Sequence, residues 1–132
     1  MIDGAFHVCD QYEALLSKTI QTSDVTKFNT RTSDSVSLNK DTVELIQYGL
    51  SYSKLSNGAF DIAVGQLTNL WNFVDDNPIV PNDSDVQSAL SHVGYQKLRL
   101  DGTVLSSTDK DIMLDLGGIA KGYIADKMKE YL

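Results

Sequence analysis

Apolar side chains recur every three or four residues in the first half of the chain, which is the spacing of one helix face. The first such segment covers roughly residues 3–18, and its apolar positions are Phe6, Cys9, Leu16 and Ile20. The second begins after Asn39, which can cap a helix, and ends at Asn57-Gly58, a pair typical of helix ends. Its inner positions are Val43, Ile46 and Leu50. The pattern predicts two helices joined by a polar segment, QTSDVTKFNTRTSDS.

The middle of the chain carries weaker helix signals. A helical face is favoured by spacings of four, three and four between the apolar positions Phe60, Val64, Leu67 and Trp71, although Gly65 interrupts it. Both prolines of the chain lie in DDNPIVPND, so a loop is expected there. A third helix is expected from about Asp83 to His92, after the capping residue Asn82.

The apolar period changes to two in the last third of the chain. KLRL and TVLS flank Asp101-Gly102, which is a strong hairpin signal. IMLD, at residues 112–115, is interpreted as a further strand, and GIAKGYIADKMKEYL as a helix that runs to the last residue. We therefore expect an α+β fold in which helices pack on a small antiparallel sheet.

Composition narrows the class of protein. The chain has 132 residues, which suits one domain, and its 42% apolar and 22% charged residues are ordinary for a soluble globular protein. The net charge of -7 and the scattered basic residues argue against nucleic acid as a partner. Cys9 is the one cysteine, so it cannot form an intrachain disulfide and is expected to pack as a small apolar residue. Neither His7 nor His92 makes a convincing catalytic base, and no ligand spacing for zinc is present.

DLGGIAKGY, at residues 115–123, places two glycines where a strand is expected to meet a helix. The first amides of a helix are unpaired and carry partial positive charge, so a phosphate can bind them if no side chain intervenes. Gly117 and Gly118 meet that condition, while Gly122 lies within the first helical turns. The alternative is a tight turn with close helix packing, and the glycine spacing is not that of a P-loop.

SNGAFDIAVG is the second candidate for chemistry. Phe60 could stack on a ring, and Asp61 could accept hydrogen bonds from an amine or hold a cation. The alternative makes Phe60 a core residue and Asp61 the cap of the following helix. Asn29, in SDVTKFN, is either a polar contact or a turn residue.

In this order, SDVTKFN, SNGAFDIAVGQLTNLWNF, ALSHVGYQKLRLDG and LDLGGIAKGYIADK resemble the ApbE family of FAD:protein FMN transferases. The resemblance implies that FMN is moved from FAD onto a threonine hydroxyl of a flavin-acceptor protein, with AMP leaving and Mg²⁺, or alternatively Ca²⁺, assisting. The FAD contacts that it implies are Ala59, Phe60, Asp61, Gly117 and Tyr123. It also makes the backbone carbonyl of Ala120 a ligand of the metal ion.

The resemblance implies in addition that residues 1–132 are part of a domain that lacks its first strand and its C-terminal portion. The family's catalytic histidine is expected beyond Leu132, so no catalytic residue is assigned and the isolated chain is expected to transfer little FMN. By analogy with the family, we expect an extracytoplasmic lipoprotein anchored to a membrane. Two alternatives stay open: an FAD-binding module without catalysis, and an inert fragment that self-associates.

Overall fold

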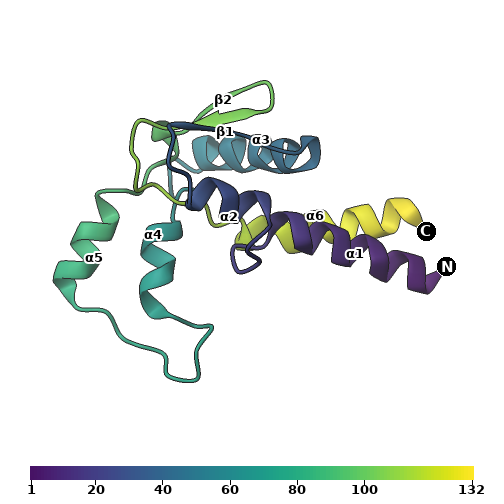
Figure 1. Cartoon of the computed structure of the whole chain (residues 1–132), viewed down its shortest axis with the longest axis horizontal. Coiled ribbons are helices and arrows are strands. Elements are labelled where there is room, and N and C mark those ends of the chain that lie inside the picture. Colours follow the sequence, from purple (N-terminus) through teal and green to yellow (C-terminus); the bar gives the residue numbers. More distant parts are fainter.

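The computed structural model describes residues 1–132 as helices around one small sheet (Figure 1). In chain order the elements are α1 (Ile2–Leu16), α2 (Asp24–Asn29), β1 (Ser35–Ser37), α3 (Lys40–Leu55), α4 (Gly65–Thr68), η1 (Asn69–Trp71), α5 (Asp83–Leu90), η2 (Tyr95–Lys97), β2 (Arg99–Asp101), β3 (Val104–Ser106) and α6 (Gly117–Tyr131).

The sheet is antiparallel with strand order β1-β3-β2, and α3 lies along one side of it (Figure 1). Leu105, on the central strand, pairs with Val36 on one neighbour and with Leu100 on the other. Its side chain is fully buried. The expected α+β fold, with helices on a small antiparallel sheet, is confirmed. The buried core comprises Leu16, Val25, Phe28, Leu38, Val43, Leu45, Ile46, Ile62, Ala63, Leu98, Leu105, Ile112, Leu114 and Leu116.

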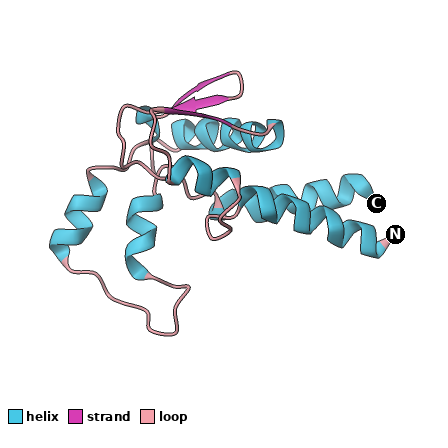
Figure 2. Ribbon diagram, in the orientation of Figure 1, coloured by secondary structure: helices cyan, strands magenta, loops and turns pink.

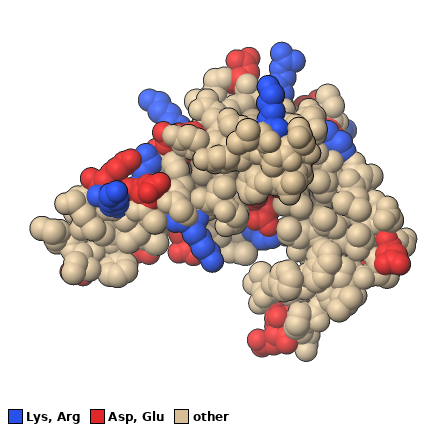
Figure 3. Space-filling model, turned by 180° about the vertical axis from the view of Figure 1, so that it is seen from behind, with Lys and Arg blue, Asp and Glu red and all other residues tan.

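Two further regions extend from this core. Helices α1 and α6 run side by side away from the sheet, and the two chain ends lie close together at their tips (Figure 1). On the opposite side, α4 and α5 form a lobe that is closed by a long loop after Trp71, as Figure 2 shows. Asp and Glu are interspersed with Lys and Arg on the face seen in Figure 3, where no extended basic patch appears. None of the helices combines the length and apolar character that a bilayer crossing requires.

The helix-cap predictions are confirmed. Asn39 accepts a hydrogen bond from the Asp41 amide at the start of α3, and Asn82 accepts one from the Asp85 amide at the start of α5. Asn57 and Gly58, after α3, have φ angles of 52° and 82°, in the left-handed region. The helix expected over 83–92 ends at Leu90, and Phe6, expected on the inner face of α1, is 59% exposed.

The polar segment after α1 is more ordered than its composition suggests. It contains α2, capped by Ser23, whose hydroxyl accepts a hydrogen bond from the Thr26 amide, and it also contains β1. Asp24 is buried, and hydrogen bonds from the Asn39 amide and the Thr42 hydroxyl to its carboxylate offset the cost of that burial. Polar residues with hydrogen-bond partners inside the protein take up positions in these elements. The sequence therefore has no apolar periodicity here that would predict them.

The strand predicted at residues 112–115 is wrong. This segment has no regular secondary structure, and its backbone groups are bonded to side chains and to a neighbouring loop rather than to a strand. Asn29 bonds both backbone groups of Leu114, and Arg31 donates to the Ile112 carbonyl. The Gly65 amide donates to the Met113 carbonyl, so the loop before α4 also holds this segment.

Two smaller corrections concern the middle of the chain and the hairpin. The helical face expected from Phe60 to Trp71 exists only as α4 followed by the single 3-10 turn η1, since the helix begins at Gly65. The hairpin is confirmed, but Asp101 pairs with Val104, so the two loop residues are Gly102 and Thr103. Gly102 has φ 59°, which suits the first position of such a loop.

Candidate functional site

The first turn of α6 is organised by the carboxylate of Asp115. Its Oδ1 accepts a hydrogen bond from the Gly117 amide at 3.0 Å. Its Oδ2 lies 2.7 Å from both the Lys18 Nζ and the Thr68 hydroxyl. The amide of Gly117, expected to be open to an anion, is therefore occupied by an acidic side chain of the same chain.

One amide of this turn remains without an acceptor. Leu116 O accepts hydrogen bonds from the amides of Ile119 and Ala120 at 3.0 and 2.8 Å, and Asp115 takes that of Gly117. The Gly118 amide has no partner in the chain, and Gly118 is exposed. The helix thus offers one backbone donor, with the partial positive charge of its N-terminus behind it.

Burial disfavours the charged form of Asp115, but hydrogen bonds from Lys18, Thr68 and the Gly117 amide outweigh that cost, so the pKa of this carboxyl is lowered. A lowered folded-state pKa contributes stability above the unfolded value, near 3.9, and this contribution is lost as the pH falls below it. The Asp115 side chain is 15% exposed and that of Lys18 is 29% exposed, so solvent weakens the pair only in part.

We expect Asp115→Asn to lower the free energy of unfolding by about 1–2 kcal/mol at pH 7, because charged hydrogen bonds are lost. The difference from the unsubstituted chain should begin to shrink as the pH falls below about 3.9, where the Asp115 carboxyl of the unfolded chain takes up a proton, and should be lost once the pH passes the lower pKa of the folded state. Urea unfolding at pH 7 and pH 3 measures both values. Asp126→Asn, on the exposed face of α6, is the control, and an equal loss at both pH values would contradict the expectation.

Phe60 packs against the start of α6. It follows the left-handed turn at the end of α3, and its amide donates to the Ser56 hydroxyl at 2.9 Å. A Cβ atom built on Gly118 would lie 3.1 Å from the Phe60 ring, so a side chain at this position would press on the edge of that ring. Phe60 and Gly118 therefore form one surface, although 58 residues separate them.

Asp61 has a structural role in its loop. Its Oδ1 accepts a hydrogen bond from the Ala63 amide at 2.8 Å, and its Oδ2 accepts one from the Tyr95 amide at 2.9 Å. It does not cap a helix, because α4 begins only at Gly65. The carboxylate joins this loop to η2, and it keeps free lone pairs for a further donor.

Tyr123 lies on the face of α6 that meets α3. Its hydroxyl donates to the Glu44 carboxylate, and its ring makes an edge contact with Tyr12 at a centroid distance of 5.7 Å. Burial, followed by the hydrogen bond to Glu44, raises the pKa of Tyr123, and that hydrogen bond lowers the pKa of Glu44. Lys127 lies 5.1 Å from the ring centroid and pairs with Glu44 at 3.4 Å. Tyr123 is thus a neutral, fixed hydrogen-bond donor.

Three cavities lie along α6. One of about 500 Å³ lies beside the contact between α1 and α6 and is lined by Cys9, Lys18, Asp115, Gly117 and Ala120, among others. A second, of about 530 Å³, lies between α6 and α3 and is lined by Glu44, Tyr48, Tyr52, Gly118, Gly122 and Tyr123, among others. A third, of about 340 Å³, is shared by Tyr52, Leu55, Ser56, Phe60, Gly118 and Ile119. Gly118 lines both of the last two cavities, and Phe60 lines the third with it.

The candidate residues are therefore divided between two faces of α6. Phe60 and Tyr123 line the α3 side, whereas Gly117 and Ala120 line the α1 side. Ala59 and Asp61 line none of these three cavities. Asp115, Lys18 and Glu44 were not predicted as site residues, because their partners lie 97 or 79 residues away and no local pattern links them.

Gly122 has open space in front of it. A Cβ built there would meet no atom within 4 Å, so no packing within the chain requires a glycine. Gly122 follows Gly118 by four residues and lines the same cavity. The two glycines leave a strip of bare helix backbone facing that cavity.

Comparison with known proteins gives consistent results. The model of the ApbE family matches residues 2–132. A "FAD:protein FMN transferase" of Klebsiella pneumoniae is 33% identical over 130 residues, covering 96% of this chain and 41% of that protein. One of Vibrio cholerae is 30% identical over 113 residues, covering 83% of this chain and 34% of that protein.

Solved structures show the same fold. The structure described as flavin transferase ApbE from Vibrio cholerae superposes with a TM-score of 0.91 at 27% identity, covering 98% of this chain and 43% of that one. The ApbE protein of Thermotoga maritima gives a TM-score of 0.90 at 30% identity, with 98% and 43% coverage. The chain spans about two fifths of the length of these relatives.

Proposed function

Because this chain belongs to the ApbE family, we propose that it forms the FAD-holding part of a FAD:protein FMN transferase. The observation that carries the proposal is the bare backbone strip of Gly118 and Gly122, which faces a cavity between α6 and α3 and has a free amide at one end. Nothing within the chain explains the glycine at position 122, so a bound molecule that approaches the helix closely is the physical reason we propose for it.

The proposed reaction transfers an FMN group to a protein. The hydroxyl oxygen of an acceptor threonine attacks the FMN-side phosphorus of FAD and forms a new phosphorus–oxygen bond. The bond from that phosphorus to the bridging oxygen breaks, AMP leaves with the electron pair, and the hydroxyl proton passes to a base. Such reactions depend mainly on positioning and on stabilising the charge of the phosphate oxygens.

In this proposal the residues on the α3 side of α6 hold FAD. The Gly118 amide donates to a phosphate oxygen, and the edge of Phe60 contacts an aromatic ring of the dinucleotide. Tyr123, fixed by Glu44, lines the other end of the cavity. Ala59, Asp61 and Gly117 remain proposed contacts of FAD. The Gly117 amide already donates to Asp115, so Gly117 would contact FAD by van der Waals packing or through its carbonyl oxygen.

We also propose Mg²⁺ with the Ala120 carbonyl as one ligand. Mg²⁺ needs about six oxygen ligands. Two carboxylates line the same cavity: Glu13 is exposed on α1, and Asp115 is already bonded to Lys18 and Thr68. The residues of this chain therefore do not make a complete magnesium site, and we assign no step of the reaction to the ion.

The test measures FAD binding and FMN transfer separately. Titration of the chain with FAD, followed by flavin fluorescence, should show saturable quenching. Gly122→Ala should weaken binding about tenfold, because a methyl group would enter the glycine strip, although the substitution meets no atom of the chain itself. Lys129→Ala, at an exposed position of α6 outside the three cavities, is the control.

Covalent flavin on an acceptor domain, measured by in-gel fluorescence with FAD and Mg²⁺ present, reports transfer. Labelling that is lost with Gly122→Ala and kept with Lys129→Ala supports the full proposal. Binding without labelling is the result expected of an FAD-holding part that supplies no catalytic residue of its own. Failure of FAD to bind at high protein concentration would contradict both.

A further inference from the structure

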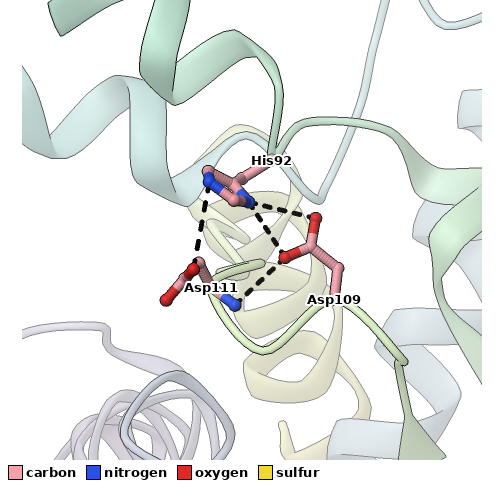
Figure 4. A group of neighbouring side chains, drawn as sticks. All are labelled: His92, Asp109 and Asp111. Carbon is pink, nitrogen blue, oxygen red and sulfur yellow. Dashed lines mark hydrogen bonds and ion pairs between the residues drawn. The ribbon is translucent and has the colours of Figure 1, made fainter.

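A histidine and two aspartates that the flavin proposal does not use lie close together, and their side chains point toward one another (Figure 4). His92 follows α5, whereas Asp109 and Asp111 lie in the loop after β3. The His92 Nδ1 is 2.9 and 3.2 Å from the two carboxylate oxygens of Asp109. The opposite ring nitrogen, Nε2, is 3.9 Å from the Asp111 carboxylate.

The contact with Asp109 assigns the proton of the neutral imidazole. A carboxylate accepts hydrogen bonds, so Nδ1 carries the hydrogen and Nε2 is left with a lone pair. Asp109 also accepts from the Asp111 amide at 3.1 Å and pairs with Lys97 at 3.1 Å. Its carboxylate is therefore neutralised and fully engaged, which suits it to orient the ring rather than to bind an ion directly.

Nε2 and the Asp111 carboxylate face each other without a hydrogen atom between them. At 3.9 Å they are too far apart for a hydrogen bond, and the Asp111 carboxylate makes no hydrogen bond within the chain. Both atoms are electron-rich when the imidazole is neutral, so they repel each other. A cation between them would remove that repulsion.

We propose that His92 Nε2 and the Asp111 carboxylate bind a divalent transition-metal ion such as Zn²⁺, with Asp109 orienting the imidazole. Imidazole and carboxylate are common Zn²⁺ ligands, and a carboxylate on the second ring nitrogen is the usual support of a metal-binding histidine. Two ligands at about 2.0–2.2 Å in tetrahedral geometry lie about 3.4 Å apart. The Asp111 side chain is 68% exposed and can make the remaining movement by rotation.

A metal ion bound by His92 and Asp111 would link the end of α5 to the loop that precedes α6. Water would complete the coordination shell, since the chain supplies two direct ligands. The competing explanation is a protonated His92 held between two carboxylates, with no metal. Mg²⁺ is the control for charge. It carries the same charge as Zn²⁺, but it prefers oxygen ligands and keeps its water, so it should not bind an imidazole nitrogen.

The experiment titrates Zn²⁺ into the full chain with ¹⁵N-labelled histidine and follows the ring nitrogens by NMR. Cys9→Ser provides the background, because a free thiol also binds zinc. His7, the other histidine, is exposed on α1 and serves as the internal control. We expect His92 to show the Nδ1–H form without metal and to shift at Nε2 with saturation, while His7 is unchanged. Mg²⁺ at the same concentration should shift neither ring.

Asp111→Asn should weaken Zn²⁺ binding about tenfold, and His92→Ala should abolish it. Asp111 is exposed and makes no side-chain hydrogen bond, so its substitution keeps the fold and gives an answer even if His92→Ala loosens α5. Equal shifts of His7 and His92, or a titration that Asp111→Asn leaves unchanged, would overturn the metal site and leave the ion pair. No flavin enters these measurements, so their outcome is independent of the proposed transferase function.

Discussion

Asn29→Ala is expected to lower the free energy of unfolding by about 2–4 kcal/mol, because two backbone groups of a buried residue would lose their partners. The Asn29 amide donates to the Leu114 carbonyl at 3.0 Å, and its side-chain oxygen accepts from the Leu114 amide at 2.7 Å. Leu114 is fully buried, so water cannot replace Asn29 without opening the core.

Urea unfolding followed by far-UV circular dichroism measures this loss. Asn69→Ala is the matched control, since Asn69 is exposed and its amide reaches only the Met113 sulfur, at 3.6 Å. The control should change the free energy by less than about 0.5 kcal/mol. Equal effects of the two substitutions would show that Asn29 does not support the segment before α6.

Gly65→Ala should destabilise the chain by about 1–3 kcal/mol, because the added methyl group has no room. A Cβ at Gly65 would lie 2.7 Å from the Leu114 carbonyl oxygen and 2.9 Å from the Met113 carbonyl carbon. These are backbone atoms, so the segment from Met113 to Leu114 must move away. That movement would also stretch the bond from the Gly65 amide to the Met113 carbonyl, now 3.0 Å.

The same substitution at Gly122 should have the opposite sign. Its Cβ would meet nothing within 4 Å, and alanine favours a helix interior over glycine by about 0.5–1 kcal/mol. Thermal and urea unfolding of the two variants side by side provide the measurement. If Gly122→Ala also lowered the free energy of unfolding, the expectation that open space and the helix preference of alanine decide its effect would be wrong.

Local sequence features were sufficient to predict most of the helices. The caps at Asn39 and Asn82 and the left-handed pair Asn57-Gly58 act within a few residues, so their effect can be inferred from the sequence. The hairpin around Gly102 is equally local. In contrast, α2 has a buried Asp24 that is stabilised by Thr42, a partner 18 residues away.

The segment at 112–115 shows why an apolar run does not establish a strand. Its partners are an asparagine side chain, an arginine side chain and a loop, and none of these is indicated by alternation. The glycines of α6 were correctly recognised as unusual. Their different surroundings were not predictable, because Phe60 lies against Gly118 while Gly122 faces open space.

The single tryptophan, Trp71, lies in η1, within the α4–α5 lobe and outside the buried core. Its backbone carbonyl accepts a hydrogen bond from the Ile79 amide, which ties the long loop back to it. Intrinsic tryptophan emission will therefore report loosening of this lobe, even while the sheet and α3 remain intact. A red shift that precedes the loss of the helical signal would identify the lobe as an independently melting unit.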